Sequence, residues 1–344
     1  MYKKIPLDLV KIEANKTIRD AMYILNTREE RFLLVVTKDR QLLGTITDGD
    51  IRRAMLKGID INQKVRLCMN KNPIISNAPM KDLSFLFSKM NSTQKFLPII
   101  NKENKILSVL LEHSNQIERK ALVMAGGFGK RLGNITKKTP KPLLKINSKP
   151  ILETILVKLE EANYKKIYVA THYLHTKIEK FLKNRNSIAD IEIIYEPNPM
   201  GTAGSINEIK NENFKSLTVL NGDIVSEINL DALNQFHSEK RYDLTLTVAH
   251  YSYKIPFGVV EFDKDYNYKS LSEKPIKKYF ILSGIYCLSK KACSLATKNY
   301  LDMPQLIDQA SKLGYKIGTF PIYEYWNDIG TSKALVYEKK RIKK

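Results

Sequence analysis

The sequence predicts a mixed, mostly parallel α/β sheet of Rossmann-like type in the last two thirds of the chain, preceded by a smaller α+β module. Three observations predict this: a repeat in the first 116 residues, alternating strand and helix patterns after residue 120, and small-residue turns where strands end. A chain of 344 residues has room for two domains or more. Strands that alternate with helices favour a parallel sheet covered on both faces.

The first 116 residues contain two similar units offset by 64 positions. The stretch "RFLLVVTKDRQLLGTITDGDI" aligns with "KFLPIINKENKILSVLLEHSN", so that Phe32 corresponds to Phe96. Each unit begins with an amphipathic helical stretch, at residues 18–25 and 83–90, and continues with a strand, a polar turn and a second strand. A unit of this size buries little apolar surface alone, so we expect the two units to share a core.

This pattern resembles a tandem pair of CBS domains, a module that often binds adenine or other nucleotides. The match of "GTITDGDIRRAM" to the family implies that Thr47 meets a phosphate or ribose and that Asp50 accepts hydrogen bonds from ribose hydroxyls. The second unit has Leu111 and Ser114 at these places, so its site is degenerate. Two roles stay open, regulation by a bound nucleotide and a platform for dimerisation. The expected boundaries are 1–58 and 59–116 for the two CBS domains and 119–344 for the domain that follows.

A glycine-rich loop follows the first strand of the larger domain, in "ALVMAGGFGKRLGNITKKTPKPLL". It is not a Walker A loop, because Gly129 and Lys130 are followed by Arg131 rather than by serine or threonine. It also lacks the third glycine of a dinucleotide fingerprint, where Leu132 stands. Glycines still let a backbone approach a ligand and turn its N–H groups toward phosphate oxygens, and Arg131 can bind phosphate with two hydrogen bonds.

The following segments alternate between helix and strand patterns. Helices are expected at residues 151–163 and 177–184, and strands at 166–171 and 191–196. A second small-residue turn, "PNPMGTAGSINEI", enters a helix, and the strand "SLTVLNGD" ends in Asp223. Ligands of parallel α/β sheets sit beyond the carboxyl ends of the strands. The glycine loop, the GTAG turn and Asp223 are all expected there.

Residues 119–344 resemble the sugar-1-phosphate nucleotidyltransferases, whose domain is of the nucleotide-diphospho-sugar transferase type. Six motifs occur in the family's order: "MAGGFGKRL", "TPKPLL", "MGTAGS", "LNGD", "SEKP" and "YWNDIGT". The resemblance implies attack by a sugar 1-phosphate on the α-phosphorus of a nucleoside triphosphate. The attacking phosphate is ionised near neutral pH, so the site must supply positioning and charge neutralisation rather than a base.

The resemblance implies roles for individual residues. Asp223 and Asp328 hold Mg²⁺, Arg131 stabilises the leaving phosphates, and Lys141 reaches the reacting phosphates. The nucleotide-binding residues are Met124, Ala125, Gly126, Gly127, Gly129, Lys130, Glu196, Gly201, Thr202 and Gly222. The sugar-binding residues are Gly258, Glu273, Lys274, Ser283 and Gly284. A carboxylate at Glu196 can accept two hydrogen bonds from guanine but only one from uracil or thymine, which favours GTP.

The domain order most resembles the glucosamine-1-phosphate guanylyltransferases of legionaminic acid synthesis, which implies that GDP-glucosamine is made for surface glycans. Alternatives are guanylyl transfer to mannose 1-phosphate or a heptose phosphate, and uridylyl or thymidylyl transfer to a hexose 1-phosphate. A further alternative is a silent, nucleotide-sensing subunit. The complete charged set of Arg131, Lys141, Asp223 and Asp328 argues against it.

Composition restricts the partners. The net charge of +21 is spread along the chain rather than concentrated, which favours polyanionic small ligands over specific nucleic-acid binding. No apolar run is long enough for a membrane span, and we expect the nearest candidate, "YFILSGIYCLS", to be a buried strand. The start lacks the pattern of a signal peptide. The three cysteines have no CxxC spacing, as is typical of free thiols in a reducing cytoplasm. We expect a homo-oligomer, with GTP and a sugar 1-phosphate as substrates.

Overall fold

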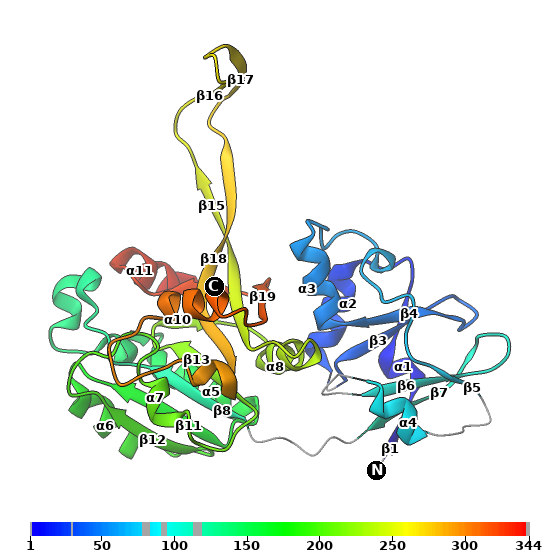
Figure 1. The fold of residues 1–344 in the computed structure, drawn as a ribbon, viewed down its shortest axis with the longest axis horizontal. Coiled ribbons are helices and arrows are strands. Elements are labelled where there is room, and N and C mark those ends of the chain that lie inside the picture. Colours follow the sequence, from blue (N-terminus) through cyan, green and yellow to red (C-terminus); the bar gives the residue numbers. More distant parts are fainter. Residues whose placement is uncertain (1, 29, 78–82, 91–94, 113–118, 342–344) are drawn as a thin grey trace.

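The computed structural model describes residues 2–28, 30–77, 83–90, 95–112 and 119–341. Two bodies lie side by side, a small N-terminal module and a larger α/β domain (Figure 1). They meet where α3 (Asp48–Leu56) of the module packs against α8 (Leu230–Glu239) of the domain. A long two-stranded ribbon projects away from the body of the domain (Figure 1).

The N-terminal module is built from two small interlocked sheets. Its strands are β1 (Tyr2–Ile5), β2 (Lys11–Glu13), β3 (Phe32–Val36), β4 (Leu42–Thr47), β5 (Ser76–Asn77), β6 (Phe96–Ile100) and β7 (Ile106–Glu112), and its other helices are α1 (Leu7–Val10), α2 (Ile18–Thr27) and α4 (Leu83–Ser88). The sheets have the orders β2-β3-β4 and β1-β7-β6-β5, so the first strand of the chain completes the sheet of the second unit. Phe32 and Phe96, which correspond in the repeat, stack with ring centroids 3.8 Å apart.

The larger domain contains a seven-stranded sheet in the order β12-β11-β8-β13-β18-β15-β19. Its strands are β8 (Lys120–Met124), β11 (Lys166–Thr171), β12 (Asp190–Tyr195), β13 (Ser216–Asn221), β15 (Leu244–Lys254), β18 (Ile276–Ser289) and β19 (Ile317–Ile322). The first four strands in this order pair in parallel, and β18 runs antiparallel to both of its neighbours. The expected mixed, mostly parallel sheet is therefore confirmed.

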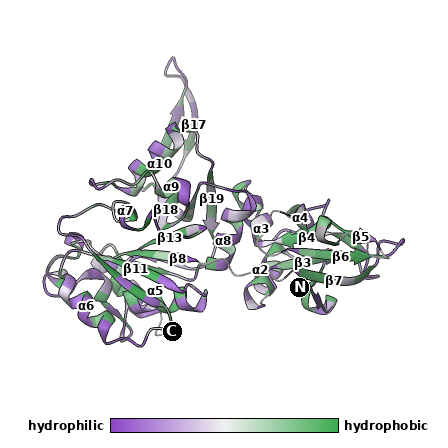
Figure 2. Cartoon of the chain, turned by 60° about the horizontal axis from the view of Figure 1, so that its bottom comes forward, coloured by the Kyte–Doolittle hydropathy of each residue, from purple (hydrophilic) through white to green (hydrophobic). Residues whose placement is uncertain are grey.

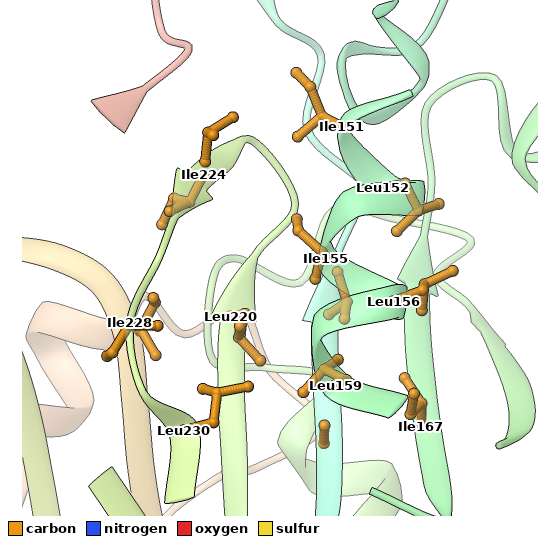
Figure 3. Packing of buried hydrophobic residues seen from close by; sticks show 14 of the residues in the cluster. Ile151, Leu152, Ile155, Leu156, Leu159, Ile167, Leu220, Ile224, Ile228 and Leu230 are labelled. Carbon is orange, nitrogen blue, oxygen red and sulfur yellow. The ribbon is translucent and has the colours of Figure 1, made fainter. Parts of the chain in front are cut away.

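Helix α5 (Ile151–Glu161) shows how the domain forms its core. Apolar residues at helical spacing, among them Ile155 and Leu159, face Ile167 of β11 and Leu220 of β13 (Figure 3). The other helices are α6 (His175–Lys183), α7 (Ile206–Ile209), α9 (Lys290–Cys293), α10 (Met303–Lys312) and α11 (Ser332–Arg341). Two short strand pairs, β9 (Lys145–Ile146) with β10 (Lys149–Pro150) and β14 (Ile224–Ser226) with β20 (Trp326–Asp328), stand outside the large sheet.

The ribbon corrects one expectation from the sequence. The stretch "YFILSGIYCLS" has the apolar content of a buried strand, but only residues 283–288 of it are buried. The outer half of β18 leaves the domain together with the outer half of β15, and β16 (Val259–Phe262) and β17 (Tyr268–Ser272) form the tip of the ribbon. Both views show it extending away from the domain (Figures 1 and 2).

None of the helices in the described ranges is long and apolar enough to cross a membrane. Cys68, Cys287 and Cys293 are buried and form no disulfide. Burial raises the pKa of the Cys287 thiol to about 12, so this side chain stays protonated at neutral pH.

Arg52 of α3 fixes the contact between the two bodies. Its side chain is fully buried and donates hydrogen bonds to Asp48 of the module and to the carbonyl of Pro321 in the domain. It also lies 3.0 Å from Glu324 and stacks over the ring of Phe320, 3.5 Å from the centroid. One guanidinium thus pairs with a carboxylate from each body.

We predict that Arg52→Ala destabilises the protein by about 3–5 kcal/mol, because two buried carboxylates lose their partner. A lower midpoint in urea unfolding, measured by circular dichroism, is the expected result. Arg19→Ala is the control, because Arg19 lies on α2 of the same module with an exposed side chain. An unchanged midpoint in Arg52→Ala would contradict this account of the contact.

Candidate active site

A pocket of about 420 Å³ lies at the carboxyl ends of β8 and β13, where the sheet topology predicts a ligand site. The predicted residues that line it are Met124, Gly126, Gly127, Lys141, Glu196, Gly201, Thr202, Gly222 and Asp223. Ala125 is fully buried behind them and donates a backbone hydrogen bond to Ala170 of β11. The glycine loop, the GTAG turn and the Gly-Asp motif therefore meet in one place.

The glycine loop ends in a turn that directs Arg131 toward the far side of the site. Gly129 has φ +64°, and a Cβ there would lie 2.8 Å from the Thr136 methyl group, so glycine is required. After this turn, the Arg131 guanidinium lies against Gly330, 3.1 Å from where a Cβ would stand. The neighbouring Lys130 places its ammonium group 5.5 Å from the ring centroid of Phe128.

Two aspartates and one lysine form a charged cluster at the pocket. Strand β14 pairs with β20 so that Ile224 lies opposite Asp328, and the carbonyl of Asp223 accepts a hydrogen bond from the N–H of Ile329 at 3.0 Å. The buried ammonium group of Lys141 donates a hydrogen bond to Asp223 and lies 3.6 Å from Asp328. With Arg131 beside them, all four predicted catalytic residues come together.

The cluster fits a divalent cation. Burial and the negative charge of Asp223 raise the pKa of Asp328, against the opposing charges of Lys141 and Arg131. One carboxylate oxygen of Asp328 is buried and has no hydrogen-bond partner in the part of the chain that the structure describes. Mg²⁺ prefers one or two carboxylates together with waters and substrate phosphates. Two adjoining carboxylates supply that kind of donor set, and the Asp328 oxygen that accepts no hydrogen bond from the described residues lies 3.6 Å from the Lys141 ammonium group.

Glu196 lines the pocket, but its carboxylate holds the GTAG turn. It accepts hydrogen bonds from the N–H of Met200 at 3.2 Å and from the hydroxyl of Ser205, and its side chain is buried. Both oxygens are thus engaged within the protein. Direct contact of Glu196 with the base stays a prediction.

The structure adds pocket residues that the sequence did not reveal, notably Phe128, Asn221, Tyr300 and Asp302. Asp302 precedes α10 and accepts hydrogen bonds from the N–H of Thr202 at 2.9 Å and from the hydroxyl of Tyr300 at 2.7 Å. Burial opposes ionisation of Asp302, but these hydrogen bonds lower its pKa below the usual value. The local signal, an aspartate before Met-Pro, indicates only a helix start.

The five predicted sugar-binding residues divide into two groups. Gly284 borders the pocket, because a Cβ there would lie 2.7 Å from the side-chain nitrogen of Asn221. The hydroxyl of Ser283 is buried and bonds to Thr247, while its carbonyl accepts a hydrogen bond from the Trp326 ring at 2.8 Å. The remaining residues, Gly258, Glu273 and Lys274, lie on the projecting ribbon and are not among those that line this pocket.

Family comparison agrees with the geometry. The model of the nucleotidyl transferase family matches residues 120–344. The chain belongs to the nucleotidyl transferase family. A CBS domain model matches residues 5–57, the first of the two expected units. The CBS assignment of the first unit is therefore confirmed along with the family.

Several relatives of this nucleotidyl transferase have named activities. Mannose-1-phosphate guanylyltransferase catalytic subunit beta of Drosophila pseudoobscura pseudoobscura is 29% identical over 62% of this chain and 60% of its own. The D-glycero-alpha-D-manno-heptose 1-phosphate guanylyltransferase of Campylobacter jejuni is 33% identical over 49% of this chain and 76% of its own. The bifunctional protein GlmU of Methanococcus maripaludis is 29% identical over 61% and 51%. The chain thus spans between half and two thirds of the length of most of these relatives.

A solved structure shares the fold of the nucleotidyl transferase domain. The crystal structure of HddC from Yersinia pseudotuberculosis matches with a TM-score of 0.52 and 24% identity, covering 65% of this chain and 99% of that chain. The same protein complexed with GMP-PN matches with a TM-score of 0.52 and 23% identity. At these identities the likeness shows the fold alone.

The CBS module of this nucleotidyl transferase has a second pocket, of about 190 Å³. Thr47 and Asp50 line it and bond to each other, because the Asp50 carboxylate accepts from the N–H and hydroxyl of Thr47 at 2.8 Å. Glu239 of α8 also lines this pocket, so its wall includes the larger domain. In the second unit Leu111 lies on β7, and Ser114 falls outside the described residues.

The cluster of carboxylates predicts how the nucleotidyl transferase binds a divalent cation. Asp223→Asn and Asp328→Asn are each expected to weaken Mn²⁺ binding at least about tenfold, because each removes a charged ligand. Electron paramagnetic resonance of free Mn²⁺ measures this directly. Asp308→Asn, an exposed change on α10, is the control and should bind Mn²⁺ like the unmodified protein. Unaltered binding in both site variants would place the cation elsewhere.

Proposed function

We propose that the protein transfers a nucleotidyl group from a nucleoside triphosphate to a sugar 1-phosphate and releases pyrophosphate. The cluster of Lys141, Asp223 and Asp328 beside Arg131 carries this proposal. An oxygen of the sugar phosphate forms a bond to the α-phosphorus, while the bond from that phosphorus to the bridging oxygen of pyrophosphate breaks. Because the nucleophile is already ionised, the residues act by positioning and charge neutralisation.

Each of these side chains has a separate role in binding the cation, the reacting phosphates or the departing pyrophosphate. Asp223 and Asp328 would hold Mg²⁺, which when bound would supply positive charge to the reacting phosphates. Lys141 exchanges its contact with Asp223 for the phosphates and holds them at bonding distance. Arg131 binds the departing pyrophosphate, since its planar guanidinium can make two parallel hydrogen bonds to phosphate oxygens.

We further propose GTP and glucosamine 1-phosphate as the substrates, with GDP-glucosamine as the product for legionaminic acid synthesis. Two relatives are named as guanylyltransferases, which supports GTP. Their named sugar phosphates, mannose 1-phosphate and a heptose 1-phosphate, are the first alternatives. The CBS pocket at Thr47 and Asp50 would bind a regulatory nucleotide.

Asp223→Asn and Asp328→Asn should each lower kcat about 100–1,000-fold, because the developing charge on the phosphates loses its neutralisation. Steady-state pyrophosphate release measures the effect, and thermal unfolding shows whether the fold is retained. The exposed Asp308→Asn should keep full activity. Near-normal turnover in both site variants would remove the proposed cation role.

A substrate panel tests the specificity. Each of four nucleoside triphosphates is combined with a set of sugar 1-phosphates, and pyrophosphate release is measured. GTP with glucosamine 1-phosphate should give the highest kcat/KM. A strong preference for UTP or dTTP would contradict the proposed base. No pyrophosphate with any pair would favour a nucleotide-sensing subunit without activity.

A further inference from the structure

Helix α11 carries a buried carboxylate, Glu338, that has no part in the proposed reaction. Its side chain is fully buried. One oxygen accepts hydrogen bonds from the hydroxyl of Tyr325 and from the side-chain amide of Asn327, the latter at 2.9 Å. The other oxygen accepts a hydrogen bond from the Arg341 guanidinium at 3.0 Å. A carboxylate of the C-terminal helix is therefore joined to the segment that leads directly to Asp328.

Helix packing does not account for a carboxylate at this position. Burying a carboxylate costs free energy unless its charge is paired and its oxygens accept hydrogen bonds. An apolar side chain attaches the helix without that cost, as the buried Leu335 does one turn earlier on the same face. What Glu338 adds is direction, because a fully satisfied buried network holds its donors in one arrangement.

The donor on β20 is next to the candidate cation ligand. Asn327 and Asp328 are consecutive residues of this strand, so their side chains point to opposite faces. Asn327 donates to Glu338 on one face, and Asp328 lies beside Lys141 on the other. Fixing Asn327 therefore fixes the rotation of the strand about its axis, and with it the direction in which Asp328 points.

Strand β20 is short and lies outside the large sheet. It has three residues and pairs with β14 in a two-stranded sheet, an arrangement that is marginal by itself in water. Arg341 adds to the support from α11, because its guanidinium stacks over the ring of Tyr325, 3.6 Å from the centroid. It also donates a hydrogen bond at 3.4 Å to Glu227, which follows β14. Helix α11 thus contacts the segments of both strands.

We propose that Glu338 is a positioning residue for Asp328. Through Asn327 and Tyr325 it sets the orientation in which Asp328 meets a divalent cation, and it touches neither the cation nor the substrates. The inference rests on the proposed function, because it assigns Glu338 to the cation site of that reaction.

Mn²⁺ binding to full-length variants tests this role. Glu338→Ala removes both acceptor oxygens and should weaken Mn²⁺ binding about tenfold, the lower end of the effect of losing an outer partner of a metal ligand. Glu338→Gln keeps the shape and an acceptor oxygen for Asn327, so it should restore most of the affinity. Leu335→Ala is the matched control, because it removes buried apolar contacts from the same helix face. It should lower Tm and leave Mn²⁺ affinity unchanged.

Trp326 supplies a second measurement that does not depend on turnover. It is the single tryptophan of the chain, it precedes Asn327 on β20, and its ring donates a hydrogen bond to the carbonyl of Ser283. Its fluorescence therefore reports on this strand. Glu338→Ala should increase quenching of the emission by acrylamide, because a looser strand exposes the ring, whereas Glu338→Gln should quench like the unmodified protein.

Unchanged Mn²⁺ affinity in Glu338→Ala, or an equal loss in Leu335→Ala or Glu338→Gln, would overturn the proposal. If Glu338→Ala does not fold, Asn327→Ala decides in its place, because it leaves Glu338 paired with Tyr325 and Arg341. It should also weaken Mn²⁺ binding, and unchanged affinity there would overturn the proposal. An unmodified protein that binds Mn²⁺ but releases no pyrophosphate with any substrate pair would refute the proposed function instead, while the Mn²⁺ affinities still decide the role of Glu338.

Discussion

The candidate site depends on one buried ammonium group shared by two carboxylates. Asp223 and Asp328 come together because β14 and β20 pair, and burial together with the negative charge of Asp223 raises the pKa of Asp328. Lys141 offsets this repulsion while no cation is bound. For the proposed reaction, this arrangement already places the charges where phosphates and a cation would replace the existing contacts, so little reorganisation would be required.

Much of the pocket could be predicted because its motifs follow strand ends. In a parallel sheet these ends meet at one edge, so "MAGG", "GTAG" and "LNGD" had to converge whatever the details of the loops. Asp302 and Tyr300 could not be predicted in the same way. Their local pattern indicates the start of α10. The hydrogen bond from Thr202 to Asp302 spans a hundred residues of chain, and Tyr300 joins it by donating to Asp302. Contacts of this kind follow from tertiary packing, which local periodicity does not encode.

The projecting ribbon formed by the outer halves of β15 and β18 could not be predicted for a different reason. An apolar run such as residues 279–289 is typical of a strand buried on both faces, whether the cover comes from its own domain or from another molecule. Half of the run, from Ser283 to Leu288, lies in the large sheet, and the other half extends beyond it. The sequence pattern predicted a buried strand over the whole run, whereas the structure buries only residues 283–288.

The contact between the two bodies also depends on oppositely charged side chains that are buried together. Arg52 is buried between Asp48 of the module and Glu324 of the domain, and any other docking of the two would leave a buried charge without its partner. The helix that carries Arg52 is capped at its N-terminus by Thr47 and Asp50, which line the module's pocket. Glu324 in turn lies four residues before Asp328 in the same segment as β20. The helix that starts at the module's pocket and the segment that leads to Asp328 are therefore held by the same buried guanidinium, so neither can shift far without breaking the pairs with Asp48 and Glu324.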